Sequence, residues 1–173
     1  MTNPSISTTD LSPMDIYQVL ESLDIAYERL DHEAAFTVEQ ADRIYGHLQG
    51  GFTKNLFLRN KKGNRHYLVV VESHKQVDLK SMRAQIGEST LSFASEDRLM
   101  RYLGLKPGSV SPLGLINDGA GEVAVYFDQD LLRHDLLNFH PDQNTTTLTL
   151  KTSDLKKFVG HTGHGFQLME IPT

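Results

Sequence analysis

Four consecutive apolar residues, Leu68-Val69-Val70-Val71, form the centre of a segment that runs from His66 to Glu72. A continuous apolar run of this length, rich in β-branched residues, is typical of a strand that is buried on both faces. Such a strand belongs to a sheet whose two faces are both covered. The run therefore predicts a strand inside a sheet that is flanked by helices.

A second strand is predicted directly before this one. The segment from Asn55 to Arg59 is rich in Leu and Phe, and the stretch Asn60-Lys61-Lys62-Gly63-Asn64 separates it from His66. A short polar stretch with Asn and Gly between two apolar segments favours a hairpin loop. We therefore expect the two strands to pair as a hairpin.

Helix-start signals recur along the rest of the chain. Ser12-Pro13-Met14-Asp15 combines a serine N-cap with proline at the first helical position. Thr37-Val38-Glu39-Gln40 is a capping box that opens a helix through about Tyr45. Ser95 caps another helix, which Gly104 ends. Further helices are predicted at residues 77–86, at residues 131–137 and after Ser153.

Short strand patterns alternate with these helices. They fall at residues 27–30, 91–93, 123–127, 145–150 and 166–171. This order of helices, hairpins and strands predicts the α/β (α+β) class with one mixed β-sheet. The chain contains no internal repeat or low-complexity segment, so we expect a disordered tail over residues 1–11 and a single compact domain over residues 12–173.

The composition excludes several classes of function. The formal net charge of −5 argues against a protein that wraps duplex nucleic acid through its phosphates. The chain contains no cysteine, which excludes disulfides, thiolate zinc sites and a cysteine nucleophile. The N-terminus lacks the apolar core of a signal peptide, and no apolar run approaches the length of a membrane helix. We expect a cytoplasmic protein that makes no membrane contact.

Lys54 and Asn55 stand at the start of the first hairpin strand, just after Gly50-Gly51. A lysine at this position can direct a cation into a cleft without being desolvated along the strand. The simpler interpretation is a solvated lysine at the end of a strand, followed by an asparagine that forms a turn or a cap. The residues alone leave both interpretations open.

A loop of small residues begins with Gly108-Ser109-Val110-Ser111-Pro112 and continues to Asp118. Glycines allow a backbone to approach a ligand closely, and the N–H groups of such a loop can bind an anion or a carbonyl oxygen. The loop can equally be a plain connection between a helix and a strand.

His140 precedes Pro141, which biases the histidine toward an extended backbone. A lone histidine of this kind is more often a hydrogen-bonded structural residue than a catalyst. Asn144 and Thr145, which follow, can form a turn that enters a strand. Each of these motifs is weak on its own.

His161 and His164 are the one pair of histidines that suggests a metal site. Glycines surround them, and no acidic residue stands nearby at the usual ligand spacing, whereas a zinc site needs three or four converging ligands. We expect no metal and no cofactor.

Taken together and in this order, the motifs resemble the YbaK/prolyl-tRNA synthetase-associated domain family of aminoacyl-tRNA editing domains. The resemblance covers roughly residues 14 to 172. Within the family the chain looks most like the free-standing branch of Ala-tRNA(Pro) deacylases, called ProX or PrdX. The segments that carry the resemblance are His32 with Thr37–Ala41, Lys54–Leu58, Gly108–Asp118, Phe127-Asp128, Phe139–Thr145 and Gly163-His164.

The resemblance implies an enzyme that hydrolyses the ester bond of mischarged tRNA. It associates Lys54 with the terminal adenosine and its phosphate, and it associates the loop from Gly108 to Pro112 with the aminoacyl ester. In the mechanism that it suggests, water attacks the ester carbonyl, either alone or assisted by the free hydroxyl of the terminal ribose. The implied catalytic residues are Lys54, Gly108 and Ser109, the two latter through backbone N–H groups, and the implied binding residues are Asn55, Ser111, Pro112, His140 and Asn144.

Three functions remain open at this level. The first is a trans-editing hydrolase for Ala-tRNA(Pro), the second is a deacylase for Cys-tRNA(Pro) or for several small amino acids, and the third is a non-catalytic module that binds a tRNA end. The partner implied by the resemblance is the acceptor end of tRNA(Pro). Because the chain is acidic and short, prolyl-tRNA synthetase or an elongation factor is a candidate second partner that supplies specificity.

Overall fold

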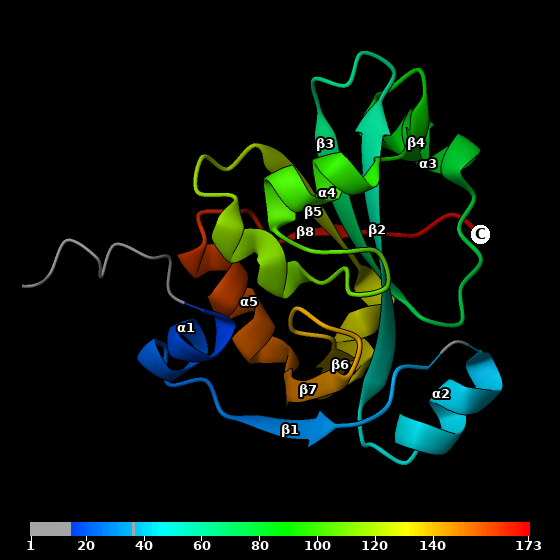
Figure 1. Cartoon of the computed structure of the whole chain (residues 1–173). Coiled ribbons are helices and arrows are strands. Elements are labelled where there is room, and N and C mark those ends of the chain that lie inside the picture. The colour runs from blue at the N-terminus through cyan, green and yellow to red at the C-terminus, as the bar shows by residue number, and fades with distance from the viewer. Residues whose placement is uncertain (1–14, 36) are drawn as a thin grey trace, which may run out of the picture.

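One mixed β-sheet organises the structure, a computed structural model that describes residues 15–35 and 37–173 (Figure 1). Within this part of the chain eight strands form the sheet, in the order β1-β7-β6-β2-β3-β5-β8, with β4 paired to β2. The strands are β1 (Tyr27–Asp31), β2 (Gly51–Asn60), β3 (His66–Glu72), β4 (Leu91–Phe93), β5 (Val123–Asp128), β6 (Leu136–Phe139), β7 (Thr146–Lys151) and β8 (Gln167–Met169).

The central strand β3 is buried on both faces, as its apolar run predicts. Leu68 and Val70 belong to one hydrophobic cluster, whereas Tyr67, Val69 and Val71 belong to a second. Side chains alternate between the two faces of a strand, so the two clusters lie on opposite faces of the sheet. The layered fold predicted from this run is confirmed.

Helices cover both faces of the sheet. Side chains of α1, α4 and α5 pack in the first cluster and those of α3 in the second, and Figure 1 shows them on opposite sides of β2. The helices are α1 (Ile16–Ser22), α2 (Val38–Tyr45), α3 (Leu79–Ile86), α4 (Glu96–Leu103) and α5 (Thr152–His161), with the short 3-10 helices η2 (Pro112–Asn117) and η3 (Gln129–Arg133). No helix among the described residues is long and apolar enough to cross a bilayer.

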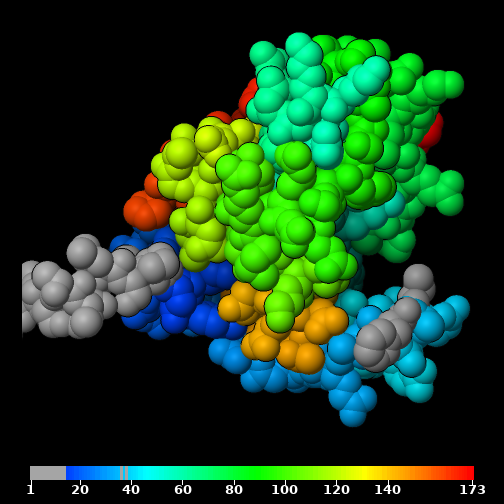
Figure 2. Space-filling view, turned by 45° about the horizontal axis from the view of Figure 1, so that its top comes forward, coloured from blue at the N-terminus to red at the C-terminus, as the bar shows by residue number. Residues whose placement is uncertain are grey.

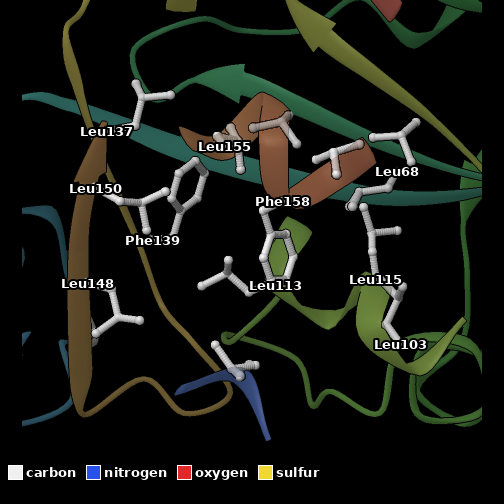
Figure 3. Close-up of a cluster of buried hydrophobic side chains, with 14 of the residues drawn as sticks. Leu68, Leu103, Leu113, Leu115, Leu137, Phe139, Leu148, Leu150, Leu155 and Phe158 are labelled. Atoms are coloured by element: carbon white, nitrogen blue, oxygen red, sulfur yellow. The ribbon is translucent and has the colours of Figure 1, made fainter. Parts of the chain in front are cut away.

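The larger cluster joins α5 and η2 to strands β6 and β7. Phe158 and Leu113 are fully buried, and Figure 3 shows the phenyl ring of Phe158 beside Leu113. Phe139 and Leu150 come from the paired strands β6 and β7 and lie at the other end of the same cluster. This packing holds the loop before η2 against the body of the domain.

The ends of β2 pair with different strands. Gly51 and Phe52 pair in parallel with β6, and Leu58 to Asn60 pair antiparallel with β4. Between these segments, from Thr53 to Leu56, no described strand pairs with this edge of β2. On the same edge, the carbonyl of Phe57 accepts a hydrogen bond from the amide of Ala94. Residues two apart in a strand direct their backbone groups to the same edge, so the N–H and C=O of Asn55 face the gap. The gap creates space for a ligand beside a rigid strand.

Several sequence predictions differ from the structure. The helix predicted after Ser153 begins at Thr152, with Lys151 at the N-cap position, so Ser153 does not cap it. The first helix begins at Ile16, with Asp15 as its N-cap in a capping box with Gln18, whereas the predicted cap Ser12 and the proline after it lie outside the described residues. The helix predicted at residues 131–137 is wrong, because Leu136 and Leu137 pair with β7 in strand β6 and only Gln129–Arg133 is helical. The predicted tail of residues 1–11 lies outside the described residues.

Candidate active site

A cavity of about 240 Å³ lies at the unpaired edge of β2. Its walls come from elements that are far apart in sequence. Helix α2 contributes Asp42 and Tyr45, β2 contributes Thr53 and Asn55, and β6 with the residue after it contributes residues 138–140. The volume is below the ~300–1,000 Å³ of pockets that enclose drug-sized ligands, so the cavity fits a small group.

Further parts of the wall come from Phe52 on β2, Thr147 on β7 and the loop after β3, with Ser73 and His74. A second hollow of about 270 Å³ lies at the start of α5, between Leu132 and Lys156. Only the first cavity contains residues that the sequence motifs single out, namely Asn55 and His140. We therefore treat it as the candidate active site.

Aromatic rings form one wall of the cavity. The ring centroid of Tyr45 lies 5.8 Å from that of Phe52 and 6.2 Å from that of His140. His32 lies behind them, 5.0 Å from Tyr45 and 6.1 Å from His140. Because planar rings in mutual contact lose little conformational freedom on ligand binding, this wall is preorganised.

Only one of the two ring nitrogens of His140 forms a hydrogen bond with a described residue. Its Nδ1 donates a hydrogen bond to the carbonyl of Thr146 at 2.9 Å. Burial lowers the pKa of His140 below its usual value, against the opposing effect of this hydrogen bond. The ring is therefore neutral at pH 7, with its proton on Nδ1, and Nε2 is a hydrogen-bond acceptor. Nε2 has no hydrogen-bond partner among the described residues.

Asn55 carries the most unusual polar atom of the site. Its side-chain Oδ1 is buried and accepts no hydrogen bond from any described residue. Buried acceptors are almost always paired, and an unpaired one costs about 1–3 kcal/mol. Because Asn55 lines the cavity, this unpaired acceptor makes it a candidate for contact with a ligand.

Asn138 fixes the geometry of this part of the site. Its amide nitrogen donates to the carbonyls of Gln49 and Gly51, at 3.0 and 3.3 Å, and its Oδ1 accepts from Thr149 at 2.5 Å. Its own carbonyl accepts from the hydroxyl of Thr53 at 3.1 Å. These bonds join the first residues of β2 to β6 and β7, so the edge that carries Asn55 is rigid.

Lys54 lies on the opposite face of β2 from Asn55, because side chains alternate along a strand. Its ammonium donates to the carbonyl of Lys75, in the loop after β3 that also carries Ser73 and His74. Lys54 does not line the cavity. The role that the resemblance gives to Lys54 stays a prediction, and its ammonium keeps two further N–H donors for an anion.

Lys75 anchors this loop through a partly buried ion cluster. Its Nζ lies 2.8 Å from Asp128 Oδ1 and 2.6 Å from Asp130 Oδ2, and the carboxylate of Asp128 also accepts from the amide of Glu72. Burial disfavours the ammonium, but the hydrogen bonds to the two carboxylates outweigh it and raise the pKa of Lys75 above its usual value. Lys75 therefore stays charged, and it fixes the carbonyl that binds Lys54.

The loop from Gly108 to Pro112 meets the segment after His140. A side-chain carbon added at Gly108 would lie 3.8 Å from Asn144 Nδ2, and the backbone of Gly108 has a φ of +85° that favours glycine. The amide of Ser109 donates to the carbonyl of Lys106 at 3.0 Å, whereas the amide of Gly108 has no acceptor among the described residues. Of the two amides predicted to bind an oxyanion, only that of Gly108 is free in this structure.

Ser111 and Pro112 have structural positions. Both are buried, and the hydroxyl of Ser111 accepts from the amide of Leu113 at 3.1 Å, which caps η2. Asn55 and His140 are thus the two predicted residues at the cavity. The structure places the other six, Lys54, Gly108, Ser109, Ser111, Pro112 and Asn144, outside its lining.

Several residues that line the cavity lie outside every motif that the sequence analysis singles out. His74 follows a strand without any pattern, and Phe52 reads as an ordinary strand residue. Asp42 and Tyr45 could have been recognised as neighbours, because residues three apart share one face of a helix. Their position over the cavity depends on how α2 packs, which no local pattern shows.

His164 takes part in a buried structural contact. Its Nε2 lies 2.7 Å from Asp118 Oδ2, and its Nδ1 lies 2.8 Å from the hydroxyl of Thr162. Asp118 also accepts from the amides of Glu122 and Val123. The pair joins the end of α5 to the loop before β5. No group of three or more potential metal ligands converges in residues 15–35 or 37–173.

Comparison with protein families matches residues 32–158 to the aminoacyl-tRNA editing domain. The prolyl-tRNA editing protein ProX of Acetoanaerobium sticklandii is 41% identical over 152 residues, which are 88% of this chain and 93% of that protein. The prolyl-tRNA synthetase associated domain-containing protein 1 of Bos taurus is 36% identical over 151 residues, which are 85% of this chain and 88% of that protein.

The fold also occurs among solved structures. A crystal structure described as a candidate trans-editing enzyme for prolyl tRNA synthetase matches this chain with a TM-score of 0.70 and 20% identity, over 90% of this chain and 92% of that one. At this identity the likeness speaks for the fold alone. It confirms the predicted single α/β domain with a mixed sheet and flanking helices.

Proposed function

Since the chain belongs to the aminoacyl-tRNA editing domain family, we propose that it is a trans-editing hydrolase that deacylates mischarged tRNA(Pro), with Ala-tRNA(Pro) as its substrate. The observation that carries the proposal is the 41% identity to a prolyl-tRNA editing protein over 88% of this chain. The cavity beside β2 supports it, because its volume of about 240 Å³ fits a small aminoacyl group.

Physical chemistry explains why such an enzyme is needed. A synthetase pocket built for proline cannot strongly reject a smaller side chain, because one methylene changes binding by only about 1–3 kcal/mol. A second hydrolytic site that admits the small amino acid corrects this error. The cavity, with its rigid aromatic wall of Tyr45, Phe52 and His140, is suited to that selection by size.

In the proposed reaction no side chain forms a covalent intermediate. A water molecule attacks the ester carbonyl, and the bond to the ribose oxygen breaks, which leaves the free amino acid and the tRNA. The amide of Gly108 stabilises the negative charge that develops on the carbonyl oxygen, a contribution of about 3–4 kcal/mol per donor in comparable sites. The free hydroxyl of the terminal ribose assists the attacking water. Lys54 binds the terminal phosphate with the two N–H donors that it does not give to Lys75.

A cationic cluster at the far end of β2 supports a nucleic-acid partner. Arg59, Arg98 and Arg101 surround the buried ring of His66, and Arg98 donates to its Nε2 at 2.9 Å. Burial first, and these guanidinium groups second, lower the pKa of His66 to about 4, so the ring adds no charge at pH 7. None of the three arginines forms an ion pair with a described residue.

The cluster continues onto the exposed hairpin turn, where Lys61 and Lys62 follow Arg59. Figure 2 shows the hairpin (teal) and α4 (green) side by side on one face, and the loop after α4 runs from there to the segment that contains Asn144 (orange). Arg59 stands about 13 Å along the strand from Asn55, at ~3.3 Å per residue. We assign this surface to the phosphates of the acceptor stem when the aminoacyl end is in the cavity.

Reversing the charge of Lys61 and Lys62 tests this surface. The double variant Lys61→Glu/Lys62→Glu should weaken tRNA binding roughly 10-fold. It should also reduce the slope of the logarithm of the binding constant against the logarithm of salt concentration, by about one for each phosphate that the protein no longer neutralises. The measurement is a titration of tRNA(Pro) at several salt concentrations. The matched control is Lys80→Glu/Lys156→Glu, the same charge change on helices α3 and α5. Equally weakened binding in the two variants would show that only net charge matters.

The function itself is tested with tRNA(Pro) charged separately with alanine, cysteine and proline. We expect the pure protein to release alanine fastest and to leave the prolyl ester intact. Faster release of cysteine than of alanine would show that Cys-tRNA(Pro) is the substrate. Comparable release of the two would indicate a deacylase for small amino acids. Binding without release of any amino acid would contradict the enzyme and favour a module that holds a tRNA end.

A further inference from the structure

An exposed aromatic ring stands at the rim of the gap in the sheet, outside the cavity. Among the described residues four large apolar side chains are well exposed. Phe93 is the most exposed at 62% and is the one aromatic ring among them, whereas Met100, Leu132 and Leu168 are 47–52% exposed. Single exposed apolar side chains are common on protein surfaces, so exposure alone gives Phe93 no function. Its position in the fold distinguishes it from the other three.

Phe93 is the last residue of β4 and pairs with Leu58 of β2. The amide of Ala94 then donates to the carbonyl of Phe57, and the unpaired part of β2 begins directly beyond this bond. At ~3.3 Å per residue, Leu58 lies about 10 Å along the strand from Asn55. Phe93 therefore borders the gap at the end that is opposite to β6, a short distance from the cavity.

The side chains of Phe93 and Lys54 lie on the same face of the sheet. Residues directly opposite each other in an antiparallel pair direct their side chains to one face, so Phe93 shares the face of Leu58. Leu58 and Lys54 are four positions apart on β2, and this even number places them on one face as well. Ala94, the neighbour of Phe93, packs against the first hydrophobic cluster on the opposite face, as alternation requires.

Phe93 thus lies between two sources of positive charge along β2. Lys54 precedes it, and the hairpin turn with Lys61 and Lys62 follows it. Proteins that bind single-stranded nucleic acid combine cations, which pair with the phosphates, and aromatic side chains, on which the bases stack. We propose that the ring of Phe93 stacks on an unpaired base of the tRNA acceptor end, on the 5′ side of the terminal adenosine.

The inference rests on the proposed function, in which Lys54 binds the terminal phosphate and the hairpin turn binds phosphates of the acceptor stem. It adds a contact that fixes the path of the single strand between these two points. Every base has a π face, so stacking on Phe93 positions the strand whatever its sequence. Phe93 is a positioning residue and does not select tRNA(Pro) among other tRNAs.

Binding of uncharged tRNA(Pro) tests this contact without any chemical step. The binding constant is measured for the intact tRNA and for the same tRNA without its unpaired 3′ nucleotides, each with the unaltered protein and with Phe93→Ala. Removal of these nucleotides should weaken binding to the unaltered protein about 5- to 100-fold more than binding to the variant, the range for a base on an aromatic ring. Phe93→Tyr, which keeps the ring, and Leu168→Ala, on the edge strand β8, should behave like the unaltered protein.

A fluorescence measurement locates the contact directly. The chain contains no tryptophan, so Phe93→Trp introduces a single indole at the proposed position. A base that stacks on an indole quenches its fluorescence. We expect the intact tRNA to quench this fluorescence and the shortened tRNA to leave most of it unchanged. Leu168→Trp is the matched control, and neither tRNA should quench it.

Equal effects of shortening the tRNA on the unaltered protein and on Phe93→Ala would overturn the inference. So would unquenched fluorescence of Phe93→Trp at saturating concentrations of intact tRNA. These results would leave the deacylase intact, because its test is the release of the amino acid. The predicted coupling without release of any amino acid would keep the stacking contact and contradict the enzyme. A protein that binds neither tRNA would contradict both.

Discussion

Asn55→Ala should lower kcat/KM for Ala-tRNA(Pro) about 10- to 100-fold and should leave the free energy of unfolding unchanged or raise it by up to about 1 kcal/mol. The two effects have one cause, because Oδ1 of Asn55 is buried without a donor in the free protein. Its removal deletes a contact to the substrate and also relieves a desolvation cost. The measurements are single-turnover deacylation and urea unfolding of the same preparation.

Asn60→Ala is the matched control, an asparagine on the same strand with the opposite environment. Its Oδ1 accepts from the amides of Asn64 and Arg65, and its Nδ2 donates to Asn64 Oδ1 at 2.7 Å. We expect this variant to lose about 2 kcal/mol or more of stability while keeping its activity under folding conditions. If Asn55→Ala destabilised the protein as much as Asn60→Ala, or kept full activity, Asn55 would be structural.

Asp128→Asn should lower the free energy of unfolding by about 3–5 kcal/mol, the cost of breaking a buried ion pair by removing one partner. The carboxylate of Asp128 is fully buried and accepts from Lys75 and from the amides of Glu72 and Asp130. The side-chain amide of asparagine has only one acceptor oxygen, and its NH₂ group is a donor that cannot accept from Lys75 or from the backbone amides. Thermal and urea unfolding measure the decrease in stability.

The same variant should also reduce deacylation under conditions in which it is folded. Lys75 would no longer fix the loop that carries Ser73 and His74, nor the carbonyl that binds Lys54. Asp130→Asn is the control, because that carboxylate is 24% exposed and also pairs with Arg133. We expect it to cost about 1 kcal/mol or less. Similar destabilisation in both variants would contradict the special position of Asp128.

Local patterns in the sequence predict much of the fold. The apolar run of β3 predicts a strand with two covered faces, because such a run has no polar residue to leave in water. The capping residues Thr37 and Ser95 predict the starts of α2 and α4, since side-chain caps act over three residues. The helix predicted over residues 131–137 is wrong, because the pairing of β6 with β7 outweighs the helical pattern of these residues.

The site is less accessible to sequence reasoning. Asn55 is significant because β2 pairs with β6 before it and with β4 after it, and both pairings join segments distant in sequence. Lys75 and Asp128 stand 53 positions apart, so their ion pair is visible only in the fold. The motifs identify Asn55 and His140 through resemblance, but only the structure shows that Asn55 Oδ1 is buried without a donor and that His140 uses Nδ1 to bind the carbonyl of Thr146.

The most direct test of the active site is to locate the binding position of an unreactive substrate analogue on the protein by NMR. The analogue is alanyl-adenosine in which an amide replaces the ester. We expect the largest chemical-shift changes on the backbone of Thr53, Asn55 and His140 and on the side-chain amide of Asn55. Chemical-shift changes confined to the hollow between Leu132 and Lys156 would contradict the assignment of the active site. So would the absence of chemical-shift changes at concentrations of the analogue that inhibit deacylation.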